Sequence, residues 1–212
     1  MRQQVLSLER RQVLLSALHL ARQANALQLV ADKVHAYYQS ISHGYDPIRS
    51  NACQTEALVR SVMLPEMQCL ECRDVDAFLS LWQNYSRYHA EITVHCEQVQ
   101  PLENDDPNVY SVQCIGRATL RISRDTIKYF FLPLLVDEDL VQSLVGKTYG
   151  FPFVSRFHFD TNGRVFKIEP RGEVASGLLN LVVDPFATVR VLGASKLTDE
   201  GCLHVYSNQD ET

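Results

Sequence analysis

Residues 110–122, YSVQCIGRATLRI, alternate between an apolar set that runs from Tyr110 to Ile122 and a mostly polar set. A repeat of two residues is typical of a β-strand with one buried face, because successive strand side chains point to opposite sides of the sheet. Thirteen such positions predict a long, half-buried strand. The rest of the chain is therefore expected to be organised around a sheet.

Segments on both sides of this strand predict its neighbours. Residues 92–96, ITVHC, alternate in the same way, and the acidic loop 103–107, which ends in a proline, predicts a hairpin connection. Further along, the phenylalanine-rich stretch 153–159 and the stretch 165–168 flank DTNG at 160–163, which is typical of a tight turn. Between these hairpins, about residues 127–148 predict a helical insertion that covers the sheet.

Helical patterns occur before the strands. Asn51 and Pro65 bound one predicted helix, and Asp74 is a suitable N-cap for a second helix that runs to His89. Helices first and strands afterwards, without β-α-β alternation, indicate an α+β fold. We expect a long N-terminal helix and then helices packed on a curved antiparallel sheet, whose concave side encloses a pocket. The predicted pocket-lining residues are Tyr38, Phe78, Trp82, Tyr85 and His89.

Catalytic signals are sparse. His89 is the one candidate general base, because it shares a helix face with Trp82 and Tyr85, although a buried structural histidine has the same pattern. Cys69 and Cys72 form a lone C-x-x-C, which predicts two packed thiols because no further ligand pair follows at zinc-site spacing. No glycine-rich phosphate loop or nucleophile elbow occurs. We therefore expect no metal, no cofactor and, apart from the candidate His89, no catalytic residue.

The N-terminal segment predicts a long helix, since no proline or glycine occurs from Gln3 to Ser42. Apolar residues recur in it at seven-residue intervals, with alanines four residues further on, which is the signature of a coiled coil. The predicted dimerisation residues are Leu6, Val13, Ala17, Leu20, Ala24, Leu27 and Val34.

This stripe has an alternative explanation in its second half. Over residues 25–43 the same spacing also suits a helix that packs on its own domain. Before residue 25, additional leucines such as Leu8, Leu14 and Leu18 would be left in water on an isolated helix. We therefore expect three parts: a zipper-like arm at 1–24, an α+β cone at 25–203 and a tail at 204–212.

Composition and charge narrow the class. The chain has 212 residues, 46% hydrophobic, and contains no apolar run of the length a membrane span needs. Its first residues have charges at 9–11 where a signal peptide would be apolar, so an intracellular protein with six reduced thiols is expected. Residues 1–43 carry five basic and two acidic side chains, whereas the whole chain has a net charge of −5. The acidic body is therefore a poor candidate for contacting nucleic-acid phosphates.

Several segments together resemble a known family. A zipper-like helix leads into VADKVHAYYQSISHGYDP at 30–47, and LVGKTYGFPFVSRFHFDTNGRVFKIEPRGEVASGLLNLV at 144–182 and VRVLGASKLTDEG at 189–201 follow. Over about residues 5–203 the chain resembles the C-terminal region of oomycete bZIP-like transcription factors. That resemblance implies a leucine zipper followed by a nuclear-transport-factor-two-like (NTF2-like), or SnoaL-like, cone.

The resemblance also implies a basic region before the zipper. This chain begins at Met1 already inside the zipper pattern, and Arg10 and Arg11 are too few for a DNA-reading helix. We expect either a piece of a longer factor or a paralogue that dimerises without reading DNA itself.

The sequence thus leads to a principal function and an alternative. The principal one is a dimerising regulatory protein, a homodimer or a heterodimer with other zipper proteins, nuclear by resemblance or else cytoplasmic, which reaches DNA only through a partner or a missing basic region. The alternative is a module that binds a small apolar ligand, or a SnoaL-like isomerase or hydratase that uses the aromatic cavity. The zipper partner, helix orientation, DNA site and ligand stay open.

Overall fold

The computed structural model describes residues 2–70, 72–106, 108–181, 185–195, 197–198, 200–202 and 204. The predicted tail at 204–212 lies outside these residues except for His204. The helices are α1 (Arg2–Ser40), α2 (Ala52–Val62), α3 (Val75–Tyr88), α4 (Arg124–Phe130), the 3-10 helix η1 (Leu132–Val136), α5 (Glu138–Leu144), α6 (Val174–Leu179) and α7 (Pro185–Ala194). The strands are β1 (Met63–Cys69), β2 (His89–Leu102), β3 (Tyr110–Ile122), β4 (Thr148–Phe159) and β5 (Val165–Gly172).

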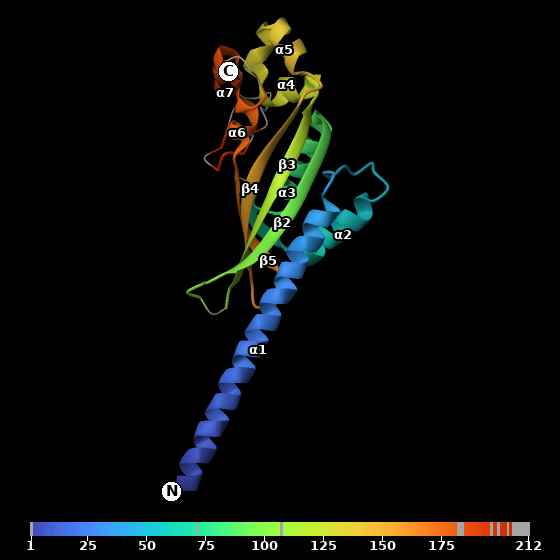
Figure 1. Ribbon diagram of the computed structural model, residues 1–212. Helices are drawn as coiled ribbons and strands as arrows, with labels where there is room; N and C mark the ends of the chain where they lie inside the picture. Colours follow the sequence, from blue (N-terminus) through green and yellow to red (C-terminus); the bar gives the residue numbers. More distant parts are fainter. Residues whose placement is uncertain are drawn as a thin grey trace.

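The five strands form one sheet in the order β1-β5-β4-β3-β2. All neighbours are antiparallel except β1 and β5, which are parallel. The α+β class is confirmed, with one correction: the sheet is mixed rather than purely antiparallel. Figure 1 shows the curved sheet with α3 and the second half of α1 against it, and with α4 to α7 gathered at the end away from the arm.

Strand β1 was missed by the sequence prediction. The helix expected to stop at Pro65 ends at Val62, and Met63 already pairs with Val165 of β5. Pro65 is tolerated here because β1 is an edge strand, where a missing backbone N–H need not break the sheet. Two backbone carbonyls, those of Arg60 and Met63, accept hydrogen bonds from the Arg164 guanidinium, which fixes β1 beside the β4–β5 turn.

Local signals place several other elements near their predicted positions, although the helix expected to run to His89 ends at Tyr88 and His89 begins β2. Asp74 accepts a hydrogen bond from the Ala77 N–H at 2.7 Å and caps α3. In the β4–β5 turn, Asp160 accepts from the Arg164 N–H at 2.7 Å, and Gly163 has a φ of +70°. At the end of α1, Gly44 has a φ of +77° and stops the helix, as a glycine at this position commonly does.

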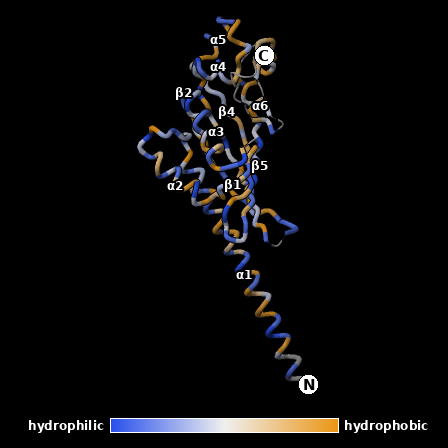
Figure 2. The backbone as a smooth tube through the Cα atoms, turned by 180° about the vertical axis from the view of Figure 1, so that it is seen from behind, coloured by the Kyte–Doolittle hydropathy of each residue, from blue (hydrophilic) through white to orange (hydrophobic). Residues whose placement is uncertain are grey.

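Helix α1 consists of two physically different halves. From residue 7 to residue 25 every described side chain is exposed, whereas Val30, Val34, Tyr38 and Ile41 are buried in the core. In Figures 1 and 2 the first half projects beyond the sheet as a bare rod, and Figure 2 shows hydrophobic and hydrophilic residues interspersed along it. Only the second half is part of the folded body, which also holds Lys33 through a hydrogen bond to the Gly163 carbonyl.

Candidate functional site: an apolar cavity in the cone

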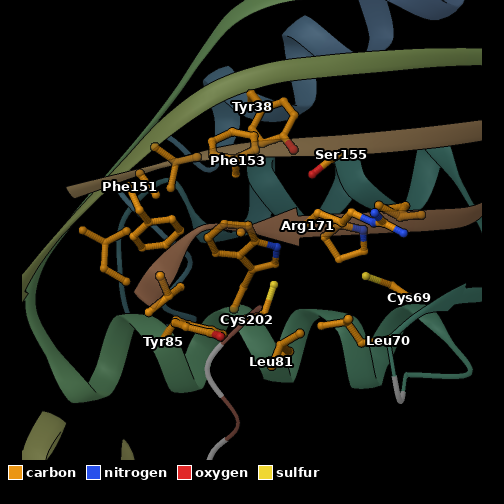
Figure 3. A pocket seen from close by; sticks show the side chains of 18 of the residues that line it. Tyr38, Cys69, Leu70, Leu81, Tyr85, Phe151, Phe153, Ser155, Arg171 and Cys202 are labelled. Atoms are coloured by element: carbon orange, nitrogen blue, oxygen red, sulfur yellow. The ribbon is translucent and has the colours of Figure 1, made fainter. Parts of the chain in front are cut away.

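A cavity of about 140 Å³ lies between the concave face of the sheet and helices α1 and α3. Figure 3 shows α3 along one side, with Leu81 and Tyr85 directed inward, and the sheet residues Phe151 and Phe153 opposite. The lining residues are Tyr37, Tyr38, Cys69, Leu70, Phe78, Leu81, Trp82, Tyr85, Ile92, Val94, Ala118, Leu120, Tyr149, Phe151, Phe153, Ser155, Phe157, Ile168, Pro170, Arg171, Gly172, Val174 and Cys202.

Side chains from α3 and α1 form one half of the cavity wall. Phe78, Trp82 and Tyr85 are four and three residues apart on α3 and therefore share a face. Tyr38 joins them from α1. Four of the five predicted pocket residues thus line the cavity, and His89 does not.

The sheet supplies the other half, which the sequence prediction did not assign. Phe151, Phe153, Ser155 and Phe157 alternate along β4 and all line the cavity. Their two-residue spacing is visible in the sequence and could have identified this wall. What it could not show is that β4 lies opposite α3, because that depends on the order of strands in the sheet.

Several polar groups of the wall are paired within the protein. The Trp82 indole N–H donates to the Tyr37 hydroxyl oxygen at 2.9 Å. The Ser155 side chain lies near Tyr38 and partly offsets the rise in the pKa of Tyr38 that burial causes. Tyr149 directs its hydroxyl away toward His89, at 2.9 Å. A bound molecule would therefore meet mainly carbon surface.

The cavity has little acid–base capacity near neutral pH. Burial raises the pKa of Tyr37, Tyr38 and Tyr149 above the ordinary tyrosine value. Burial also raises the pKa of the Cys69 thiol, and that of Cys202 to about 11. Arg171 is the one charged residue among those lining the cavity; it is exposed, and strand alternation places its side chain on the face opposite Ile168. The described wall thus offers no general base.

His89 has a structural role instead of the catalytic role considered for it. Its side chain is 4% exposed and lies behind Tyr149. The Tyr85 carbonyl can only accept, so His89 Nδ1 donates to it at 2.9 Å and Nε2 accepts from the Tyr149 hydroxyl. Burial lowers the pKa of His89 to about 4 and keeps the ring neutral. The sequence hypothesis required an open pocket beside His89, and the histidine is sealed from it by Tyr149.

The C-terminal segment closes one side of the cavity. The Gly172 N–H, at the end of β5, donates to the Glu200 carbonyl at 3.0 Å, and Cys202 then reaches the cavity wall. A Cβ atom on Gly201 would lie 2.2 Å from the Gly172 carbonyl oxygen. The close approach of these two backbones therefore requires glycine, and Figure 3 shows the Cys202 sulfur directed into the cavity.

The predicted dimerisation residues fall in different environments. Val13 and Leu20 are 68% and 64% exposed on the arm, and Ala17 and Ala24 are exposed beside them. Leu27 is half-buried where the arm meets the body. The prediction for Val34 is wrong. Its side chain is 1% exposed because it packs in the core of its own chain, so it cannot face a partner. The Leu6 side chain lies outside the described residues.

Other candidate chemistry is limited. Among the described residues, no three His, Cys, Asp or Glu side chains gather in a way that could hold a metal ion. Cys69 and Cys72 are buried and joined by two backbone hydrogen bonds of 2.8 and 3.1 Å. No helix in the described part of the chain is long and apolar enough to cross a membrane.

No protein-family model matches the chain, and no curated protein matches it. Among solved structures, an NTF2-like protein of unknown function from Exiguobacterium sp. 255-15 is 8% identical, with a TM-score of 0.44, over 66% of this chain and 97% of that one. A phenazine biosynthesis-related protein from Pseudomonas aeruginosa is 12% identical, with a TM-score of 0.46, over 78% and 92%. A SnoaL-like polyketide cyclase from Agrobacterium tumefaciens str. C58 is 12% identical, with a TM-score of 0.43, over 77% and 98%.

At these identities and TM-scores, the similarities assign no activity to this chain. The chain itself is a long N-terminal helix followed by an α+β domain with its helices on a curved, mixed five-stranded sheet.

Proposed function

We propose that the chain binds a compact, uncharged apolar or aromatic molecule in the cone cavity and does not transform it. The observation that carries the proposal is the wall itself: its aromatic and aliphatic carbon surface is open to a ligand, while the hydroxyls of Tyr37 and Tyr149 are engaged with protein groups. Burial of apolar ligand surface in such a site makes the binding free energy more favourable. A charged group would bind less well, because it would lose its hydration without gaining a partner.

The volume sets the size of the ligand. An engineered apolar cavity of about 150 Å³ in another protein stays dry and binds benzene. At about 140 Å³, this cavity suits a molecule of about one aromatic ring with small substituents.

Calorimetric titration with toluene, indole and benzoate tests this proposal. Toluene or indole should bind, and benzoate, similar in size but charged, should bind at least about tenfold more weakly. Ala118→Phe fills the cavity from β3 and should abolish binding. Ala57→Phe, at an exposed position of α2, is the matched control and should leave binding intact. Equal binding of benzoate, or binding that survives Ala118→Phe, would contradict the proposal.

A second candidate function, self-association, is favoured by the arm. Leu8, Val13, Leu15, Leu18 and Leu20 are each between 55% and 68% exposed, on a rod that no other part of the described chain covers (Figure 1). Leaving this much apolar surface in water is unfavourable, and coiled-coil pairing is the usual way to bury it. We propose that a second copy of this chain covers it, because Val13, Leu20 and Leu27 keep the seven-residue spacing.

Light-scattering mass measurements over a dilution series test the pairing. The wild type should have at least the mass of two chains at high concentration, and Leu20→Lys should return the mass to one chain. Gln12→Lys adds the same charge on the exposed arm outside the stripe and should pair normally. A single-chain mass for the wild type at every concentration would refute self-pairing.

The family resemblance leads to a more specific hypothesis about this arm. We propose that the arm could also pair with other zipper proteins, that the chain would then act in transcription regulation in the nucleus, and that a partner would supply any DNA contact. Mixed-chain pull-downs with the zippers of the same cell would test this extension, and its failure would leave the ligand-binding proposal untouched.

A further inference from the structure

Two cysteines meet where α1 crosses the sheet. The sulfur atoms of Cys96 on β2 and Cys114 on β3 lie 2.8 Å apart. A β-bulge makes this possible: Cys96 pairs with Gly116 and Val99 pairs with Cys114, with a register shift between Cys96 and Gln98. Both side chains lie on the helix-covered face of the sheet, so the pair is held by the backbone of two hydrogen-bonded strands.

The two thiols differ in access and in acidity. Cys96 is half-buried, whereas Cys114 is fully buried. The Cys114 thiol donates a hydrogen bond to the Cys96 sulfur, which lowers the pKa of Cys96, and the same contact together with burial raises the pKa of Cys114. His35 Nδ1 on α1 lies 3.9 Å from the Cys96 sulfur. An accessible, activated thiol beside a buried second thiol is the arrangement of an attacking and a resolving cysteine.

We propose that Cys96 and Cys114 form a reversible disulfide in response to hydroperoxides, so that this strand pair is a redox modification site. In the first step the Cys96 thiolate attacks one peroxide oxygen. The O–O bond breaks, the sulfur is oxidised to a sulfenic acid, and hydroxide or alkoxide leaves with the electron pair and takes a proton from water. In the second step the Cys114 sulfur displaces the sulfenic hydroxyl. The S–S bond forms, and the Cys114 proton leaves with that hydroxyl as water.

The location connects this site to the cavity. Tyr38 interacts electrostatically with Cys114 and also lines the cavity wall, so one side chain adjoins both places. A disulfide would change the charge and position of the Cys114 sulfur beside Tyr38. Oxidation is therefore expected to alter the aromatic wall from behind while leaving the sheet pairing intact.

Peptide mapping of the full-length protein tests the proposal. After a short hydrogen peroxide treatment and alkylation of the remaining thiols, digestion with trypsin and a glutamate-specific protease separates Cys96 from Cys114. The expected product is a cross-linked peptide pair whose mass is two hydrogen atoms less than the sum of the two peptides. Dithiothreitol should reduce the disulfide and release both peptides. Cys96→Ser, at the half-buried position, should eliminate it, and Cys53→Ser, at an exposed position of α2, should not change its yield.

A second variant identifies the order of the steps. Cys114→Ala should leave Cys96 as a sulfenic acid that a 1,3-diketone reagent traps. Recovery of Cys96 only as sulfinic or sulfonic acid in the wild type, with Cys114 still open to alkylation after denaturation, would overturn the proposal. So would a disulfide found only between Cys69 and Cys72.

Discussion

At the scale of single residues, His89 supports the cavity wall from behind, because it is buried and hydrogen-bonds to Tyr149, which lines the cavity. Its two ring nitrogens connect the backbone of α3 at Tyr85 to the hydroxyl of Tyr149 on β4. A neutral ring serves both contacts, since one nitrogen must donate and the other must accept. The residue type that is most often considered for acid–base chemistry is here a positioning residue for the cavity wall.

His89 should make the stability of the protein depend on pH. Its pKa in the folded protein is about 4, below the ordinary value of about 6.5 expected after unfolding. Between these values the unfolded chain binds the proton and the folded chain does not, so the free energy of unfolding should fall as the pH falls from about 6.5 to 4. A difference of this size corresponds to roughly 3 kcal/mol over the whole window, and the contribution is fully present above pH 6.5.

Urea unfolding at several pH values measures this effect. Between pH 4 and 6.5, the pH dependence of the unfolding free energy reports how many protons are taken up on unfolding. His89→Gln should reduce that number by about one, and it should also lower the stability at pH 7. His95→Gln, at an exposed position further along the same strand β2, should retain the slope. Parallel slopes for the wild type and His89→Gln would show that His89 is not the titrating group.

At the scale of elements, α1 is one continuous helix whose halves respond to different forces. Val34 is buried and Leu15 is 58% exposed on the same helix. Val34→Ala should lower the free energy of unfolding by roughly 2 kcal/mol, because it leaves a cavity in the core. Leu15→Ala should change the unfolding of the isolated chain by less than about 0.5 kcal/mol. Chemical denaturation at low protein concentration checks both values, and equal losses would contradict the division of the helix.

The C-terminal segment is a second element whose attachment can be tested. Gly201 and Gly146 both have left-handed backbone angles, with φ of +71° and +85°, but only a Cβ on Gly201 would meet another backbone. Gly146→Ala should therefore cost only about 1 kcal/mol of strain. Gly201→Ala should also detach the segment from β5, so that the Gly172 amide, which now donates to Glu200, exchanges with solvent faster.

Hydrogen exchange at the Gly172 amide separates these two effects. An increase specific to Gly201→Ala is the expected result. An unchanged Gly172 rate in that variant would mean that the segment does not depend on the close approach of Gly201.

At the scale of the whole molecule, ligand binding and folding should be linked. A ligand that binds only the folded cone adds about 2.7 kcal/mol to the unfolding free energy at one hundred times its Kd. For a chain of this size, that amounts to a rise of several degrees in Tm. Thermal unfolding with and without indole should show this rise in the wild type and not in Ala118→Phe. A rise of equal size in both proteins would place the binding elsewhere.

Much of the architecture could be predicted because its signals are local. The alternation at 110–122, the Asp74 cap and the turn at 160–163 each act within a few residues, and each lies where the sequence placed it. Strand β1 could not be predicted in this way. Its seven residues contain Pro65 and become a strand only because β5, about one hundred residues away, offers an unpaired edge.

The sequence by itself determined the α+β class, the long first helix and one aromatic helix face of the cavity, since periodicity and capping depend on neighbouring residues. Only the tertiary structure decided which residues of that periodicity are buried. Leu20 and Val34 belong to the same seven-residue repeat, yet Leu20 is exposed on the arm and Val34 lies in the core. The same holds for His89 and Trp82, which the sequence placed on one helix face: His89 instead begins β2, where Tyr149 lies between it and the cavity, whereas Trp82 on α3 lines the cavity. Burial depends on what lies opposite a residue, and that is decided by contacts between segments far apart in the chain.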